Sequence, residues 1–549
     1  MSSSLPLSHS GQAATVLAWQ ALCVALVAFV LFLLGAHGAA VVGFDSRFVL
    51  FAKEMLRHGP SVFPTTYGEP YPDYPATSTF LIYLLSLPQG RVTLLSAWLP
   101  TALAAAVIVG LTYRLVAPLS RRWAALSVSM LLLTLTFLSE TRAVSLDLQV
   151  AAVGMLAFFF AVHAERYSGV GLLTRLLPLL LAGFALRGPL GLVVPAGMVC
   201  SQLLLDRQWR RLLGFSLPAL LLLMVCTMLL LSVARGVGGE AFAQDVLHMQ
   251  VTGRLDGSAG ASDALYYFHS SLGNYALAFP LAVPALALLW RRRFDPAARL
   301  VIGCALAALV VMVGLSLPQA KKARYIVAMA PLAAIVATYP FQVNDRRLAV
   351  FLRGLIQGLW LVLPALLLLG IWLGLQRFPQ ALQPLGGKLW LCVGGLAGLQ
   401  VFALSRLFRR ERRAELMALS AVLALWGSYL LVIEPAQRQL YDSRAFSQAV
   451  DAAVLREPAP LVLYGMGRDA QAIKFMVNLD RDTQPLFASS PAQLAALPGP
   501  YYLMLDEENA DRLRAAYPAL GVPLLSGSFD YNPYCLLRVS DASLFGAAR

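Results

Sequence analysis

Two residues that could take part in acid–base or anion chemistry follow the first apolar run of the chain, Asp45 and Arg47. From Phe48 onward, apolar residues recur at helical spacing, which predicts an amphipathic helix at a membrane interface. Asp45 then lies at the N-terminal end of that helix. A carboxylate in this position can cap the helix or act as a general base toward a hydroxyl group, and both interpretations fit the residues.

A proline-rich segment from 67 to 75 carries two more carboxylates, Glu69 and Asp73, among aromatic residues. Its three prolines predict a stiff, non-helical chain that could hold either carboxylate at the membrane surface. A structural turn would explain the same composition. The apolar run Phe80–Leu87 that follows predicts a second interfacial helix.

Cationic side chains interrupt or adjoin apolar runs at two places. Arg187 lies inside an apolar stretch, before a Gly-Pro pair, where a cation is costly unless it meets an anion or reaches the interface. Lys321, Lys322 and Arg324 lie directly before Tyr325 at the start of another run. Clusters of this kind bind phosphate, because Lys and Arg donate several charge-assisted hydrogen bonds.

Other turns carry weaker candidates. Glu140, Arg142 and Asp147 occupy one turn between two apolar runs, where a helix cap with a local ion pair is the ordinary explanation. His58 and His269 could supply metal ligands, but no metal-ligand spacing links them.

The elements that position these residues must be membrane helices. The chain has 549 residues, of which 58% are hydrophobic and 13% charged, and its mean hydropathy is +0.68, too apolar for a soluble protein. The formal net charge is +14, but the arginines gather in short clusters between apolar runs, which indicates membrane topology and argues against a nucleic-acid partner. Five of the six cysteines lie in apolar runs, so no disulfide framework is expected.

A membrane span needs roughly 20 apolar residues, and about thirteen segments approach that length. Arginine clusters fall in every second connection, which places those connections in the cytoplasm. The first outer loop, the segment 236–272 and everything after Ile433 then lie on the opposite side. The expected spans are Leu17–Gly35, Leu94–Val116, Trp123–Leu138, Leu148–Ala164, Leu173–Leu186, Leu190–Leu205, Leu212–Val233, Leu277–Trp290, Leu300–Leu317, Tyr325–Tyr339, Leu355–Leu375, Leu389–Leu404 and Leu416–Ile433.

The segment 434–549 has a different character from the membrane region, 1–433. Short apolar runs of strand length, such as Leu461–Tyr464 and Tyr501–Leu505, alternate with helix-like stretches near Asp469–Val477 and Asn509–Tyr517. This alternation predicts a small α/β domain on the outer side of the membrane.

The order of these motifs resembles the GT-C family of glycosyltransferases. The closest branch contains the protein O-mannosyltransferases and the aminoarabinose transferases of lipid A, and the likeness covers nearly the whole chain. No single motif is strong, and the resemblance rests on the order of the motifs along the chain. The motifs are an Asp with a nearby Arg after the first span, a proline-rich motif before the second, Arg142 with Asp147 between the third and fourth, Arg187-Gly-Pro between the fifth and sixth, and Lys321 with Tyr325 and Pro331 late in the membrane region.

The resemblance implies roles for individual residues. Asp45 corresponds to the catalytic carboxylate, and Asp147 to a second acidic residue of the site. Asp73 corresponds to an acidic residue implicated in metal coordination, for which His58 or His269 would be the partner ligand of a divalent ion. The expected donor-phosphate residues are Arg187, Lys321, Lys322 and Arg324, and the expected supporting residues are Arg47, Glu69, Asp73 and Tyr325. The chain departs from the branch at Tyr74, where the branch has Lys, and at Ala76, where it has a second Pro.

The expected protein is therefore an α-helical integral membrane protein with a GT-C fold of about thirteen transmembrane helices. The resemblance implies a bacterial inner-membrane enzyme whose active site faces the periplasm. It would transfer a sugar from undecaprenyl phosphate to a periplasmic acceptor, with a protein hydroxyl preferred over lipid A or a glycan. It implies no certain cofactor, and a divalent metal ion is the one candidate. The alternative is a polytopic transporter or lipid flippase, although transporters gather polar residues at the membrane midplane in repeated halves.

Overall fold

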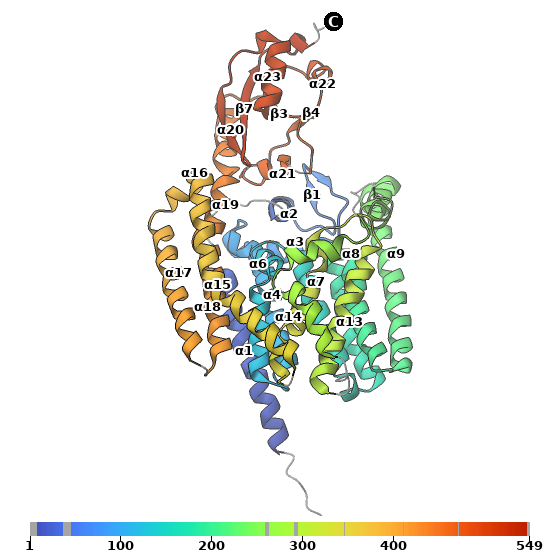
Figure 1. Ribbon diagram of the computed structural model, residues 1–549. Helices are drawn as coiled ribbons and strands as arrows, with labels where there is room; N and C mark the ends of the chain where they lie inside the picture. Colours follow the sequence, from blue (N-terminus) through green and yellow to red (C-terminus); the bar gives the residue numbers. More distant parts are fainter. Residues whose placement is uncertain are drawn as a thin grey trace, which may run out of the picture.

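The structure is a computed structural model that describes residues 8–36, 45–257, 263–289, 295–344, 346–409, 411–469 and 471–545. It has two parts, a broad bundle of helices and a small α/β domain that stands on one end of the bundle (Figure 1). The N-terminal helix projects from the opposite end of the bundle (Figure 1). Within the described residues, eight helices are long and apolar enough to cross a membrane, or up to ten when each of two bent helix pairs is taken as one span.

The bundle is built from long apolar helices joined by short turns. Each of the thirteen predicted apolar segments falls on helical structure, although several are bent or short. The helices are α1 (Ser8–Leu33), α4 (Leu94–Val116), α5 (Arg121–Leu132), α6 (Leu135–Thr141), α7 (Leu146–Val162), α8 (Gly169–Leu205), α9 (Trp209–Leu247), α10 (Gly253–Leu255), α11 (Tyr266–Asn274), α12 (Ala278–Ala285), α13 (Pro296–Ser316), α14 (Met329–Ala337), α15 (Arg347–Arg377), α16 (Pro379–Leu382), α17 (Gly387–Ser405), α18 (Arg413–Ser428) and α19 (Glu434–Leu440).

Helix α8 contains a sharp reversal at Arg187 and Gly188. Gly188 has φ +59°, a conformation that suits glycine because it has no Cβ. A Cβ on Gly183 would lie 2.1 Å from the carbonyl oxygen of Gly191. In a continuous helix these two residues would be about 12 Å apart, so the chain must fold back on itself here. The two predicted spans on either side of Arg187 are thus two packed halves of α8.

Helix α14 is the enclosed centre of the bundle. All nine of its residues are buried, and at this length it extends only about 14 Å, less than half the thickness of a bilayer core. Trp123 of α5 donates its indole N–H to the hydroxyl of Thr338 just beyond the helix, at 3.1 Å. The predicted span Tyr325–Tyr339 is therefore a buried helix with short 3₁₀ turns at both ends.

A layer of short elements lies between the bundle and the α/β domain (Figure 1). The predicted helix after Asp45 is present as α2, and its residues Phe48–Ala52 are all buried, whereas an amphipathic helix on an open surface would bury one face only. The α/β domain covers its other side, because Lys53 donates to the carbonyl oxygen of Val477 at 2.8 Å. The layer comprises α2 (Asp45–His58), β1 (Thr65–Thr66), β2 (Glu69–Pro70) and α3 (Thr77–Ser86).

The α/β domain predicted for the C-terminal segment is confirmed. Its five strands have the order β4-β3-β5-β7-β6, with β3 parallel to β4 and β5, and β7 antiparallel to β5 and β6. The central strand β5 is buried along Tyr501–Leu505, as expected for a strand covered on both faces. The elements are α20 (Arg444–Arg456), β3 (Leu461–Tyr464), α21 (Gln471–Met476), β4 (Leu486–Ala488), α22 (Pro491–Ala495), β5 (Tyr501–Asp506), α23 (Glu507–Ala516), β6 (Leu525–Phe529) and β7 (Asn532–Val539).

Candidate active site

Asp147 lies in the first turn of α7 because Ser145 caps that helix. The Ser145 hydroxyl accepts a hydrogen bond from the backbone N–H of Leu148 at 3.2 Å. The Asp147 side chain is buried, and the N-terminal end of a helix favours a negative charge. This cap explains how an apolar helix can begin with a buried carboxylate.

Two guanidinium groups from distant parts of the chain meet this carboxylate. Arg187, at the reversal of α8, forms an ion pair with Asp147 and is 4% exposed. Nε of Arg324, in the 3₁₀ turn Ala323–Ile326, lies 3.2 Å from the other carboxylate oxygen. Arg187 also stacks over the ring of Tyr325, with its Cζ 4.5 Å from the ring centroid. The structure therefore brings together four residues that the sequence singled out separately.

Arg254 is the third guanidinium at this site and is itself buried, and no sequence pattern singled it out. Its Nη2 donates to the hydroxyl of Tyr74 at 3.1 Å, and its Nε donates to the carbonyl oxygen of Met249 at 3.0 Å. Its own carbonyl accepts from the backbone N–H of Gln319 at 2.8 Å, which joins it to the segment before Lys321. The π-helical turn His248–Thr252 precedes it, and such turns occur often at functional sites.

Two buried donors of this cluster have no hydrogen-bond acceptor among the described residues. They are Nε of Arg187 and Nη1 of Arg254. A buried donor without an acceptor is costly, and the cost is larger for a charged group. An anion with several acceptor oxygens, such as a phosphate, would satisfy both donors.

Tyr74 lies between Arg187 and Arg254, and its ring centroid is 5.8 Å from the Cζ atom of each. Burial alone would raise the pKa of its phenol, but the charges of Arg254 and Arg187 outweigh that effect and lower the pKa to about 7. The sequence identified Tyr74 only as a departure from the family pattern. The structure makes it a central polar group of the cluster.

The remaining cations lie at the edge of this cluster. Lys322 is close enough to Arg324, Tyr74 and Arg254 to interact with their charges, and Lys321 adjoins it in the segment before the 3₁₀ turn. Both lysines are more accessible than Arg187.

The acidic candidates of the first outer loop occupy different surroundings. Asp45 is the first residue of α2, and its side chain lies outside the described part of the structure. Arg47, two residues on, forms an ion pair with the buried Asp73. Glu69 is exposed on β2 and pairs with Arg468 of the α/β domain at 3.0 Å.

Arg142 performs a structural role. It is 5% exposed and forms a bidentate ion pair with Glu434. Its Nε and Nη2 donate to Oε2 at 3.1 and 2.8 Å, and Nη2 also lies 3.0 Å from Oε1. Its Nη1 donates to the carbonyl oxygen of Phe32 at 2.6 Å. These contacts join the end of α6 to α19 and α1. The local ion pair expected within this turn is not what Arg142 forms, because its partner Glu434 is 292 residues away and the pair is buried.

An apolar groove opens beside the polar cluster. It has a volume of about 390 Å³ and lies between α11, α12, α13 and α14. A small cavity of about 10 Å³, room for a single water molecule, touches Asp147, Arg187 and Tyr325. Leu315 lines the small cavity, and Met312, on the preceding turn of α13, lines the groove. The groove thus reaches within one helical turn of the guanidinium cluster.

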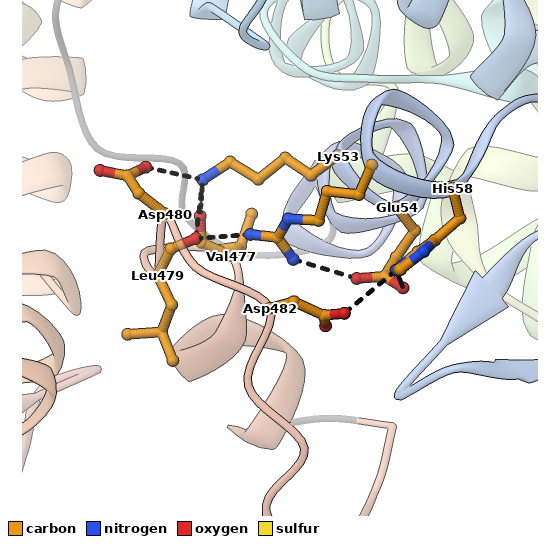
Figure 2. Close-up of polar contacts among 8 residues, drawn as sticks. Lys53, Glu54, His58, Val477, Leu479, Asp480 and Asp482 are labelled. Carbon is orange, nitrogen blue, oxygen red and sulfur yellow. Dashed lines mark hydrogen bonds and ion pairs between the residues drawn. The ribbon is translucent and has the colours of Figure 1, made fainter. Parts of the chain in front are cut away.

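The histidines considered as metal ligands do not pair with Asp73 among the described contacts. Nε2 of His269 lies 2.9 Å from Asp263. His58 instead belongs, with Glu54 and Asp482, to a group whose possible ligand atoms all lie within 4.8 Å of one another (Figure 2). Asp73 pairs with Arg47 instead, and no group of possible metal ligands that includes Asp73 is found among the described residues.

The helical bundle with an α/β domain at one end defines a polytopic membrane protein. Among solved structures, the chain resembles ArnT from Cupriavidus metallidurans over nearly its whole length. ArnT bound to undecaprenyl phosphate matches with a TM-score of 0.67 at 16% identity, covering 93% of this chain and 96% of that chain. ArnT in the apo state matches with a TM-score of 0.67 at 18% identity, covering 97% and 99%. No protein-family model and no curated protein sequence matches. The fold is the GT-C fold expected from the order of the motifs.

Proposed function

We propose that the protein is a membrane glycosyltransferase that takes a sugar from a polyprenyl-phosphate donor. One observation carries the proposal: two buried guanidinium groups with unsatisfied donors, Arg187 and Arg254, and a third that is partly exposed, Arg324, lie beside an apolar groove. A phosphate on a long hydrocarbon chain combines the two chemistries that this arrangement would bind. The likeness to ArnT, solved with undecaprenyl phosphate, supports the same ligand class.

The guanidinium cluster would stabilise the leaving group. When the acceptor oxygen bonds to the anomeric carbon, the bond from that carbon to the phosphate oxygen breaks, and the phosphate gains a negative charge. Arg187, Arg254 and Arg324 are fixed in place by Asp147 and Tyr74 before the reaction, so little reorganisation accompanies the developing charge. Lys322 at the edge would assist.

Asp45 is the better candidate for the general base. Asp147 lies between two guanidinium groups, which makes it a positioning residue for the arginines and a poor acceptor for a proton. Asp45 at the start of α2 would receive the proton of an attacking hydroxyl. An acceptor that is already an anion would not need this step, and Asp45 would then act by orientation.

We further propose that the site faces the periplasm of a bacterial inner membrane and that the acceptor is a hydroxyl group, on a protein in preference to lipid A or a glycan. The arginine clusters on the other side of the bundle support this orientation through the positive-inside rule.

The test is transfer by the purified protein in proteoliposomes, supplied with polyprenyl-phosphate sugars and candidate acceptors. Asp45→Asn should lower the rate by about 10²- to 10⁴-fold if a base is required. Mass spectrometry of surface proteins and lipid A, with and without the protein, identifies the acceptor. Undecaprenyl phosphate that moves between leaflets while no sugar is transferred would overturn the proposal in favour of a flippase.

A further inference from the structure

A second polar cluster lies outside the guanidinium site, where α2 meets the α/β domain (Figure 2). It consists of Glu54 and His58, one helical turn apart on α2, and Asp482 from the segment between α21 and β4. Nε2 of His58 lies 3.2 Å from Oδ2 of Asp482 and 3.8 Å from Oε2 of Glu54. We propose that these three side chains bind one divalent metal ion of the zinc class, which joins α2 to the α/β domain.

Glu54 gives independent support for a ligand at this point. The residue is 3% exposed, and one of its carboxylate oxygens, Oε1, accepts a hydrogen bond from Arg57 at 3.1 Å. The other, Oε2, is buried without a hydrogen-bond partner and lies toward the imidazole of His58 and Asp482. A buried carboxylate oxygen without a partner is costly, and a cation between the three side chains would satisfy it.

The donor set and its spacing fit a zinc ion. One imidazole nitrogen and two carboxylate oxygens are ligands that zinc takes at about 2.0–2.2 Å, with one coordination position remaining for water. Ligand atoms at such distances around a tetrahedral ion are separated by roughly 3.5 Å. The distances of 3.2 and 3.8 Å from the His58 imidazole to the two carboxylates lie close to that value, and the ligand atoms of Glu54 and Asp482 lie within 4.8 Å of each other, so a small inward movement completes the site. His58 and Asp482 are each about half exposed, which leaves the ion a path from water.

The surrounding contacts show what the metal would hold. Lys53 donates to the carbonyl oxygens of Val477 and Leu479 at 2.8 and 3.3 Å, and Arg57 donates to that of Leu479 at 3.1 Å. The Lys53, Glu54 and His58 side chains therefore all point toward the same segment of the α/β domain (Figure 2). A metal at Glu54, His58 and Asp482 adds a strong bond to these weaker ones and fixes the domain over the outer layer. The proposal does not depend on the transferase assignment.

The test is metal binding by the untagged full-length protein in nanodiscs, after removal of bound metal with a chelator and reloading with Zn²⁺. The wild type should retain one equivalent after gel filtration, measured by mass spectrometry of the metal. His58→Ala and Asp482→Asn should each weaken Zn²⁺ binding by about 100-fold or more, since losing even an outer-shell partner costs 10- to 100-fold. His269→Ala, which alters a histidine that pairs with Asp263 outside this cluster, is the matched control and should retain the ion.

A second measurement distinguishes metal binding from a simple ion pair between His58 and Asp482. Zn²⁺ should raise the melting temperature of the wild type from which metal has been removed, and it should protect the segment 477–485 from protease. It should do neither in Asp482→Asn. Asp482 is exposed and its amide replacement keeps the shape, so that variant should fold. A wild type that binds no Zn²⁺, or His58→Ala and Asp482→Asn proteins that bind it as well as the wild type, would overturn the proposal.

Discussion

Replacement of Arg187 by Met tests the proposed phosphate site most directly. Arg187 is 4% exposed, forms an ion pair with Asp147 and stacks over Tyr325 at 4.5 Å. Methionine retains much of the apolar stem and removes the charge and all five N–H donors. Asp147 would retain Arg324 at 3.2 Å, so its carboxylate would not be left buried and unpaired.

The expected loss has two parts. Removing one partner of a buried ion pair costs about 3–5 kcal/mol of stability, and the remaining contact with Arg324 favours the lower end, about 3 kcal/mol. A charge-assisted hydrogen bond to a phosphate contributes about 1.5–3 kcal/mol to binding. Since about 1.4 kcal/mol corresponds to a factor of ten, Arg187→Met should weaken the binding of undecaprenyl phosphate by roughly 10- to 150-fold.

The assay is titration of undecaprenyl phosphate into monodisperse protein in nanodiscs, with the folded fraction checked by thermal unfolding. Arg187→Lys should lose less affinity, because it keeps the charge and loses the planar fork of donors. Arg235→Met is the control for a general change of charge, since Arg235 is exposed and pairs with Glu240 at 2.7 Å. If folded Arg187→Met binds the lipid as tightly as Arg235→Met does, the assignment of Arg187 to the phosphate is wrong.

Three other side chains give measurable expectations. Tyr74 has a pKa of about 7, so raising the pH from 6 to 8 adds a negative charge to the site, and that charge should weaken phosphate-lipid binding. Tyr74→Phe should remove the part of the pH dependence that is due to the phenol. If Tyr74→Phe and the wild type show the same pH profile of binding, the pKa of about 7 is contradicted. Ala305→Trp fills the apolar groove and should weaken binding of undecaprenyl phosphate more than that of a short-chain prenyl phosphate, whereas equal losses would place the lipid chain elsewhere. Arg142→Ala removes the main partner of the buried Glu434 and leaves it only Arg438 among the described ion pairs. The free energy of unfolding should fall by about 3–5 kcal/mol in a thermal or denaturant unfolding experiment. The folded Arg142→Ala protein should keep its affinity for the lipid, and a loss of affinity with normal stability would contradict the structural role.

The membrane region could be predicted from sequence because hydrophobic length is a local property. Leu94–Val116 is both the predicted run and the observed helix α4. The reversal at Arg187 was also visible, because a cation followed by Gly-Pro interrupts an apolar run. The burial of α14 inside the bundle could not be predicted, since an apolar run has the same composition whether lipid or protein surrounds it. Likewise, the burial of α2 on both sides depends on the α/β domain, which lies some 400 residues away in sequence.

The candidate site was predictable only in part, for a related reason. Asp147, Arg187 and Arg324 stood out because each charge adjoins an apolar run, where it needs a partner. Arg254 lies in a long polar segment, where one more arginine is unremarkable by composition. Its importance comes from its contact with Tyr74, 180 residues away, and no local pattern encodes such a contact.

Tyr74, at the position where the GT-C branch that the sequence resembles has Lys, would alter how the proposed site handles a phosphate. Three guanidinium groups against one carboxylate leave the cluster with a net charge of +2 while Tyr74 is neutral. That charge matches a phosphate monoester, which carries close to two negative charges at neutral pH because its second pKa is about 6. A lysine would add a fixed charge and hold the spent polyprenyl phosphate more tightly, whereas a phenol with a pKa of about 7 can give up its proton and reduce the attraction. Tyr74 would then ease release of the product, so its replacement by Lys should slow turnover while tightening lipid binding.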